Sequence, residues 1–581
     1  MGKSYGIRGR LVWQIATVFL KLMLISCVEA RIQSYKWKVK YEYKSPDCYE
    51  KLVITINGES PGPTIFAEQG NTVVVEVDNL LVTENLAIHW HGIRQIGSPW
   101  SDGANGITQC PVQPGEKFVY KFVVDKAGTY IYHAHYGLQR SSGLYGSIHV
   151  IPSDGVKEPF SYDREHTLLI NDWWHKSSAE QTAGLSSIPF RWVNEPQSLL
   201  IQGRGAYNCS LVNNQLNSLG TGSICNTTNP ECSPHVIPVV FGKTYRLRIA
   251  SVTSLSAINF MIEGHNMTIV EADGNYVEPV VVQNLNLYSG ETYSVIVKAD
   301  NDPSRNYWAA VNILGRMPKT PTGTAVFNYY PNHPKKPPLT TPPNGPLWND
   351  TNYALAQSQS LKALKGFNPG PPFSSDRAIN MFFTQNKIEG FSRWSINNFS
   401  FVLPSTPYLI ALKQNLPHTF DPTPPPEKYD LQNYDIHLPP KNPNASYSDS
   451  IYRLDFNSTI DIILQNTNML DPNKSETHPW HLHGHHFWVL GHGIGVFDPV
   501  NDPKKYNLVN PVVKNTVPAF PYGWTVIRFR ADNPGIWAFH CHVEAHYYLG
   551  MGVVFEEGIE RVARLPKSIM GCGKSKRLAR P

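Results

Sequence analysis

The chain has 581 residues, 41% of them apolar and 12% aromatic, with 51 basic and 46 acidic side chains. This length predicts several domains, and the apolar and aromatic content excludes a disordered chain. The net charge of +5, without a basic run in the body of the chain, argues against a nucleic-acid-binding protein.

The N-terminus is predicted to be a secretory signal over residues 1–30. Basic Lys3, Arg8 and Arg10 precede the apolar stretch Leu11–Cys27, and small residues surround a plausible cleavage site. Polar residues interrupt this stretch, and no later run resembles a membrane span or a lipid-anchor signal. We therefore predict a secreted, extracellular protein without a membrane anchor.

Cysteine usage agrees with secretion. Apart from Cys27 in the signal and Cys541, which is treated below, an even number of cysteines remains, and this predicts three disulfides with fifteen possible pairings. These six are Cys48, Cys110, Cys209, Cys225, Cys232 and Cys572. Eight Asn-x-Ser/Thr sequons also predict N-glycosylation at some of these sites.

The remainder of the chain is predicted to be all-β. Short runs rich in β-branched and aromatic residues are separated by turn signals, a pattern typical of β-sandwiches and barrels. The clearest predicted strands, in chain order, are Thr72–Val77, Lys117–Val124, Thr244–Ile249, Tyr293–Val297 and Thr525–Phe529.

One unit recurs three times along the chain. The first and third copies share Gly-x-aromatic-x-aromatic-His-x-His, at residues 128–135 and 535–542, and a His-x-His-Gly precedes each. The middle copy, at 289–312, keeps the strand pattern but has no histidine there. With proline-rich segments as linkers, this pattern predicts three homologous domains after the signal. The predicted division is signal 1–30 and domains 31–158, 159–372 and 373–581.

Four separate His-x-His pairs stand out, where this composition leads one to expect roughly one. Alternate residues of a strand lie on one face about 6.5–7 Å apart, so each pair suits two neighbouring ions. Two pairs from each terminal domain can supply eight imidazoles to a metal cluster between those domains. Imidazole alone does not choose among copper, zinc, iron and nickel. The pairs are His89/His91, His133/His135, His481/His483 and His540/His542.

Cys541 narrows the choice of metal. It lies inside the last histidine pair, on the opposite face of the strand, and His546 and Met551 follow at five-residue intervals. Together with His478, these residues form the two-histidine, one-thiolate, one-methionine set of an electron-transfer copper. The first repeat has alanine, glutamine and leucine at the positions of Cys541, His546 and Met551, so this site is predicted only in the third domain.

Such an arrangement predicts an oxidase. The thiolate of Cys541 is one residue from a clustered histidine on each side, which gives electrons two short covalent routes. One mononuclear and three clustered coppers together store four electrons, the number that reduces dioxygen to two waters. The reduction consumes protons, and Asp102 and Glu544 are candidate proton carriers, Glu544 if the strand continues past His542. Each is equally well explained as a structural carboxylate.

These motifs resemble those of the multicopper oxidase family: His-Trp-His-Gly, His-x-His, His-Pro-x-His-x-His and His-Cys-His-x3-His-x4-Met. The resemblance covers essentially all of residues 31–575 and implies three cupredoxin-like Greek-key domains with four copper ions. Within the family it is strongest to the plant enzymes that oxidise L-ascorbate, through Ser98–Gly103, Ser475–His485 and Val270–Val277. It implies L-ascorbate and dioxygen as substrates and a location in the apoplast or cell wall, and it is compatible with a homodimer.

The resemblance also implies a ligand set for each copper. The type 1 copper takes His478, Cys541, His546 and Met551; the type 2 copper takes His89 and His481; the type 3 pair takes His91, His133 and His542 on one ion and His135, His483 and His540 on the other.

Further expectations come from the same resemblance. Ascorbate is expected beside His546, between Trp192 and Trp394. The implied disulfides are Cys48–Cys232, Cys110–Cys572 and Cys209–Cys225. The sequence departs from the family pattern at Ala134, His486, Ala545, Tyr547 and Tyr548, and the last three are expected to flank the electron-donor site.

Two alternatives remain open at this point. A laccase-type oxidase of phenols would use the same scaffold, although a coordinating Met551 favours the modest potential that suffices for ascorbate. A copper-free, non-enzymatic cell-wall protein would have lost ligands, whereas all twelve positions are filled.

Overall fold

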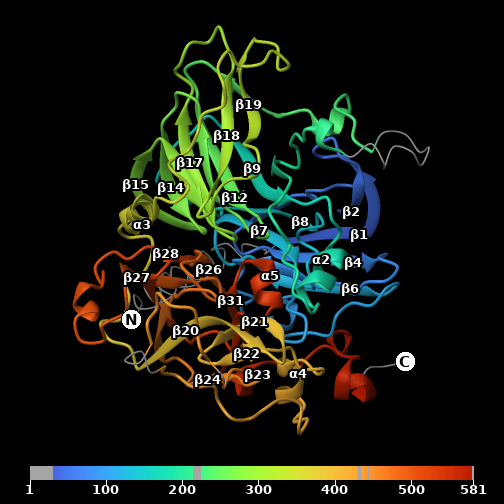
Figure 1. Cartoon of the computed structure of the whole chain (residues 1–581), viewed down its shortest axis with the longest axis vertical. Coiled ribbons are helices and arrows are strands. Elements are labelled where there is room, and N and C mark those ends of the chain that lie inside the picture. The colour runs from blue at the N-terminus through green and yellow to red at the C-terminus, as the bar shows by residue number, and fades with distance from the viewer. Residues whose placement is uncertain (1–30, 213–223, 430–433, 443, 579–581) are drawn as a thin grey trace, which may run out of the picture.

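The computed structural model describes residues 31–212, 224–429, 434–442 and 444–578, so the predicted signal at 1–30 lies outside the described residues. Within the described residues the chain forms six β-sheets, and each sheet takes its strands from only one of the three predicted segments. Figure 1 shows three β-rich bodies in blue, green and orange-red. The fold is therefore all-β, as predicted, while the domain boundaries at 158 and 372 remain predictions.

The first segment packs two four-stranded sheets. Strand β4 shows why its sequence forms a half-buried strand: Val73, Val75 and Val77 alternate inward while the residues between them stay partly exposed. In sheet order the strands are β2 (Lys51–Ile56), β1 (Ile32–Lys44), β4 (Thr72–Asn79) and β6 (Lys117–Val123), and then β3 (Ile65–Glu68), β8 (Tyr145–Ile151), β7 (Gly128–Ala134) and β5 (Ile88–His91).

The middle segment has a six-stranded and a five-stranded sheet. These are β10 (Ser198–Ile201), β9 (Arg164–Trp173), β12 (Thr244–Ser251), β17 (Thr292–Lys298), β14 (Met267–Ala272) and β15 (Asn275–Val282), and then β11 (His235–Val240), β19 (Gly323–Tyr330), β18 (Tyr307–Leu314), β13 (Ala257–Ile262) and β16 (Asn284–Leu287). A short helix, α2 (Ser178–Leu185), begins with a capping box in which Ser177 and Glu180 satisfy each other's backbone amides.

The third segment has an eight-stranded and a five-stranded sheet. These are β23 (Ser446–Ser448), β22 (Phe399–Phe401), β21 (Phe391–Ile396), β20 (Arg377–Ile388), β25 (Thr459–Gln465), β30 (Gly523–Arg530), β27 (Phe487–Ile494) and β28 (Val513–Lys514), and then β24 (Tyr452–Leu454), β32 (Gly552–Glu557), β31 (Gly535–Cys541), β26 (His478–Leu482) and β29 (Thr516–Ala519). The remaining α-helices of the described residues are α3 (Thr351–Ser360), α4 (Tyr408–Lys413) and α5 (Glu544–Tyr548), and none of these helices has the length and apolar character needed to cross a membrane.

The three segments repeat one strand pattern. Strands β4, β12 and β25 each pair in parallel with an earlier strand and antiparallel with a later one. Strands β7, β18 and β31 each lie between two antiparallel neighbours in the second sheet. The internal repeat predicted from the sequence is therefore a repeat of topology, and β18 is the middle copy of the histidine-bearing strands.

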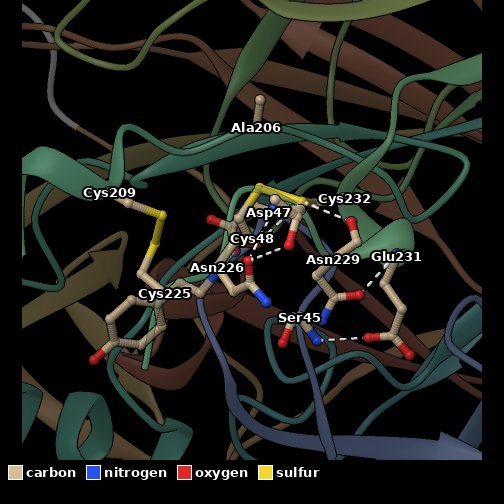
Figure 2. Close-up of a disulfide and its surroundings, with 12 residues drawn as sticks. Ser45, Asp47, Cys48, Ala206, Cys209, Cys225, Asn226, Asn229, Glu231 and Cys232 are labelled. Atoms are coloured by element: carbon tan, nitrogen blue, oxygen red, sulfur yellow. Dashed lines mark hydrogen bonds between the residues drawn. A yellow bond between two sulfur atoms is a disulfide. The ribbon is translucent and has the colours of Figure 1, made fainter. Parts of the chain in front are cut away.

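The three disulfides have the pairing that the resemblance implies: Cys48–Cys232, Cys110–Cys572 and Cys209–Cys225. Figure 2 shows the first and third of these close together, beside the hydrogen bond from the Ser45 amide to Glu231. The Cys110–Cys572 disulfide spans 462 residues and ties the first segment to the C-terminal end of the chain. Cys541 is the free cysteine of the described residues, and it is buried.

Removing the Cys110–Cys572 disulfide is expected to lower the thermal unfolding midpoint more than removing Cys209–Cys225. A disulfide restricts the unfolded chain more when it closes a longer loop, and these two span 462 and 16 residues. The expected loss is about 2–5 kcal/mol for the longer loop. Calorimetry of the two double Cys→Ser variants measures it, and equal midpoints for the two variants would contradict this explanation.

Candidate metal centre

Two pairs of neighbouring strands bring the four His-x-His pairs together. In the first segment β5 lies beside β7 and sets His89 opposite His133. In the third segment β26 lies beside β31 and sets His481 opposite His540. The second histidine of three pairs lies just past its strand end, and seven of the eight rings are buried, with His135 partly exposed.

The eight rings meet at the boundary between the first and third segments. Their ligand atoms form three groups of three, and within each group all atoms lie within 4.8 Å of one another; the first two groups share His91. The groups are His89/His91/His481, His91/His133/His542 and His135/His483/His540. The second and third groups coincide with the two sets that the resemblance implies for the type 3 pair, and the first contains the two residues implied for type 2.

Hydrogen bonds fix which nitrogen of these rings is free. The Nδ1 atoms of His89 and His481 donate to the backbone oxygens of Asp102 and Asn515, each at 2.8 Å. Their Nε2 atoms are therefore unprotonated, and they face each other at 3.2 Å. Two lone pairs at this distance repel unless a cation lies between them, and ligand atoms around one metal are roughly 3–4 Å apart.

The same arrangement recurs on the other side of the cluster. Nδ1 of His540 donates to the Cys541 oxygen at 3.0 Å, and Nδ1 of His483 donates to Asp102 Oδ2 at 2.8 Å. Their Nε2 atoms face each other at 3.1 Å. The donor set is therefore oriented toward shared positions that fit metal ions.

A separate group lies on the opposite face of β31. Cys541 Sγ is 3.7 Å from Nδ1 of both His478 and His546, and these two nitrogens are 3.2 Å apart. Met551 is fully buried, and its backbone oxygen accepts the Cys541 amide at 3.0 Å, which brings it beside this group. The group matches the chemistry of an electron-transfer copper site.

Burial decides the protonation states of both groups. Desolvation lowers the pKa of His540 and of His546 to about 3, so both imidazoles are neutral and able to bind a metal. Burial also raises the pKa of the Cys541 thiol, so a thiolate at this position requires a cation. The residues present therefore fit copper, with neutral imidazoles and one thiolate as donors.

The two tryptophans expected at the donor site both lie near His546. The rings of Trp192 and Trp394 are centred 5.7 Å and 5.1 Å from the His546 ring. Trp192 is partly buried and Trp394 is 1% exposed, so Trp192 presents more of its surface to a small molecule. On the outer side of the same imidazole, Glu476 Oε2 lies 3.7 Å from His546 Nε2, and Glu476 lines a cavity of about 720 Å³.

Asp102 is fully buried between the two histidine-bearing segments. Its Oδ2 accepts from His483 Nδ1, and its Oδ1 is 3.3 Å from His89 Nδ1, so one carboxylate contacts a ring from each terminal segment. The following Gly103, with φ of +82°, is required here, because a Cβ atom would lie 1.7 Å from the Ile88 oxygen. This glycine allows the loop to approach β5 closely enough for Asp102 to reach both rings.

Glu544 is placed differently from the expectation. Strand β31 ends at Cys541 and α5 begins at Glu544, so the strand does not continue past His542 and the condition for placing Glu544 on its face is not met. The carboxylate instead accepts the backbone amides of Arg140 and Ser141 at 3.0 and 3.2 Å. It lines a cavity of about 830 Å³ that reaches four clustered histidines: His133, His135, His540 and His542.

Some residues around the cluster carried no sequence signal. Arg140, Asn515 and Thr516 all contact ligand rings, yet no motif marks them. Tyr547, one of the departures from the family pattern, packs 4.3 Å from the His540 ring. It therefore lies at the cluster and not at the electron-donor site, because helix α5 turns its side chain away from His546.

Comparison with known proteins agrees with this geometry. Three multicopper oxidase family models match residues 38–155, 164–332 and 418–561. The chain is 51% identical to an L-ascorbate oxidase of Cucumis sativus, over 94% of this chain and 92% of that protein. It belongs to the multicopper oxidase family.

Other multicopper oxidases are more distant. Laccase-11 of Arabidopsis thaliana is 35% identical over 91% of this chain and 93% of its own. The structure of a laccase from Botrytis aclada superimposes with a TM-score of 0.74 at 26% identity, covering 93% of this chain and 90% of that one. As a multicopper oxidase, the protein uses four copper ions, one type 1, one type 2 and a type 3 pair, and the histidine groups fit such sites.

Proposed function

We propose that this multicopper oxidase removes electrons one at a time from L-ascorbate and uses four of them to reduce dioxygen to water. The observation that carries the proposal is the position of Cys541, which shares one group with His478 and His546 while its two chain neighbours belong to the histidine cluster. The similarity to enzymes named L-ascorbate oxidase supports ascorbate as the donor.

We assign the ligands by these groups. His478, Cys541, His546 and Met551 hold the type 1 copper; His89 and His481 hold type 2; His91, His133 and His542, and His135, His483 and His540, hold the type 3 pair. When bound, the copper ions supply one-electron acceptance at the first site and dioxygen reduction at the cluster.

The chain's own residues orient these sites and exclude water from them. Burial keeps the imidazoles of His540 and His546 neutral by lowering their pKa. Asp102 holds the ring of His89 through its backbone oxygen and the ring of His483 through its carboxylate. The backbone on either side of Cys541 is the shortest covalent route from the donor site to the cluster. Glu544 lies in the cavity that reaches the cluster, and burial raises its pKa, which suits a group that takes up and releases a proton.

At the donor site, ascorbate is proposed to contact His546 and Trp192. The buried Trp394 packs against the rings of His478 and His546, with ring centres 4.8 and 5.1 Å away. Replacing Trp192 by alanine is expected to raise KM for ascorbate about two- to tenfold, because loss of a ring contact costs about 0.5–1.5 kcal/mol. The thiolate-to-copper absorption band should not change. Steady-state oxygen uptake measures KM.

The matched control is Trp308→Ala. Trp308 is partly buried in the middle segment, where its indole donates to the Thr340 oxygen, and it lines neither cavity. An unchanged KM in the Trp192 variant, or an equal rise in both variants, would contradict the donor assignment.

Oxygen uptake also separates the proposal from its alternative. The purified protein should consume oxygen faster with ascorbate than with a diphenol at equal concentration. Faster turnover of the diphenol would move the assignment to a laccase-type oxidase, to which the 35% identity with Laccase-11 gives some support. Absence of the thiolate-to-copper band would remove the oxidase proposal altogether.

We further propose that the protein is secreted to the cell exterior. The signal-like residues 1–30, the sequons and the three disulfides all suit an oxidising, extracellular compartment. N-terminal sequencing of protein collected from the medium of expressing cells tests this, with cleavage after a residue close to Ala30 as the expected result.

A further inference from the structure

The middle segment supplies none of the proposed copper ligands, yet one of its turns reaches the cluster. The turn joins β16 to β17, and its residues Tyr288, Ser289 and Glu291 are buried. Ser289 Oγ lies 2.8 Å from His542 Nδ1 and also donates to the backbone oxygen of Thr253. The hydroxyl proton can be donated only to a backbone oxygen, that of Thr253 or that of His542 at 3.3 Å, so the hydroxyl oxygen accepts the Nδ1 proton of His542.

That hydrogen bond sets the direction of the His542 ring. With Nδ1 protonated, Nε2 is the free nitrogen, and it lies 3.1 Å from His133 Nε2. Arg140 Nη1 is 2.9 Å from one ring nitrogen and 3.1 Å from the other, so it lies over the ring face and not in the ring plane. Ser289 is therefore the partner that fixes the tautomer of this ring.

The backbone of Gly290 lies close to two ligand rings, with no room for a side chain. Its φ is +92°, and a Cβ atom there would lie 2.9 Å from His91 Cε1 and 3.0 Å from His542 Nδ1. His91 comes from the first segment and His542 from the third. The turn therefore lies where rings of the two terminal segments meet, and only glycine leaves both rings in place.

Asp273 forms a second contact from the middle segment to the cluster. Its Oδ2 accepts the backbone amides of Asn515 and Thr516, each at 3.1 Å. The Asn515 oxygen in turn accepts from His481 Nδ1, and the side chains of both residues lie 3.1 Å from His91 Nε2.

A buried cation links Asp273 to the turn. Lys514 Nζ is 3.3 Å from Asp273 and 3.2 Å from Glu291. All three side chains are buried, so each depends on the others for compensation of its charge. The two contacts of the middle segment are thus parts of one network.

We propose that the ligand-free middle segment positions the copper cluster, with Ser289, Gly290 and Asp273 as positioning residues for His542, His91 and His481. This inference rests on the ligand set proposed above. It goes beyond that set, because residues of the histidine-free middle segment then orient copper ligands that belong to the two terminal segments.

The first test compares Gly290→Ala with Gly242→Ala. Both glycines have positive φ, +92° and +79°, in turns of the same segment, but an added Cβ at Gly242 meets nothing within 4 Å. We expect Gly290→Ala to keep the thiolate-to-copper band and to lose copper from the cluster, seen as fewer than four ions by elemental analysis and a changed type 2 signal in electron paramagnetic resonance. Gly242→Ala should keep all four.

The second test removes a single hydroxyl group and adds no atom, so it remains informative if the Gly290→Ala variant does not fold. Ser289→Ala is compared with Ser251→Ala, which removes an equally buried hydroxyl that contacts Thr253 and no ligand ring. We expect a chelator to strip cluster copper from Ser289→Ala at about 10- to 100-fold lower concentration than from Ser251→Ala. Equal copper retention in the two serine variants, with a normal type 2 signal, would overturn the inference.

The wild-type protein distinguishes the two proposals. If the wild type binds four coppers and the Gly290→Ala and Ser289→Ala variants retain copper equally well, only the proposed positioning role fails. If the wild type itself lacks the thiolate band and the cluster copper, the proposed ligand set fails.

Discussion

Replacing Cys541 by serine is expected to abolish both the thiolate-to-copper absorption band and oxygen uptake, while the protein stays folded. The side chain is fully buried, and serine is close to cysteine in size, so little volume is lost. A neutral hydroxyl is a poor copper ligand, and no other thiol of the described residues can replace it, because the remaining cysteines there form disulfides.

Three measurements separate loss of chemistry from loss of structure in this variant. The visible spectrum reports the type 1 site, an oxygen electrode reports turnover, and circular dichroism reports the fold. We expect turnover to fall by about 10³-fold or more, since removal of an essential group has effects of this size. A serine variant that still consumed oxygen with ascorbate would show that electrons reach the cluster by another route.

Replacing Asp102 by asparagine is expected to slow oxygen reduction about 10- to 100-fold without affecting electron uptake at the donor site. The carboxylate contacts Nδ1 of both His89 and His483, and outer partners of ligand histidines have effects of this size on affinity or activity. Asparagine keeps the shape and the backbone oxygen that accepts from His89 Nδ1, but it replaces the charged acceptor of His483 Nδ1 and removes the negative charge 3.3 Å from His89 Nδ1.

The two half-reactions can be measured apart. Without oxygen, ascorbate should bleach the thiolate-to-copper band of the Asp102 variant at the wild-type rate. With oxygen, recovery of the band should be slow. Equal rates of recovery in variant and wild type would show that Asp102 has no part in oxygen reduction. Slower bleaching would mean that the substitution disturbs the donor site as well.

The sequence was informative wherever the chemistry requires a fixed spacing. Alternation along a strand sets both histidines of a pair on one face and Cys541 on the other, so the residue pattern alone predicts the separation into two groups. The repeated topology was predictable for the same reason, because β7 and β31 carry matching patterns and β18 keeps the strand without the histidines.

What the sequence did not indicate depends on contacts between distant segments. Ser289 lies 253 residues from His542, and Arg140 lies 402 residues from it, so no local pattern connects them. Glu544 would share the strand face of His542 only if the strand continued, and the sequence did not show that it ends at Cys541 and that α5 begins at Glu544. Tyr547 was expected near the donor site from its distance in sequence to His546, and the short helix carries it to the cluster instead.

Diffraction from crystals of the copper-loaded protein, recorded on both sides of the copper absorption edge, would locate the metal ions themselves. We expect four anomalous peaks: one between Cys541, His478 and His546, and three enclosed by the eight paired histidines. A missing peak beside Cys541, or fewer than three peaks among those histidines at full copper loading, would be incompatible with the proposed sites.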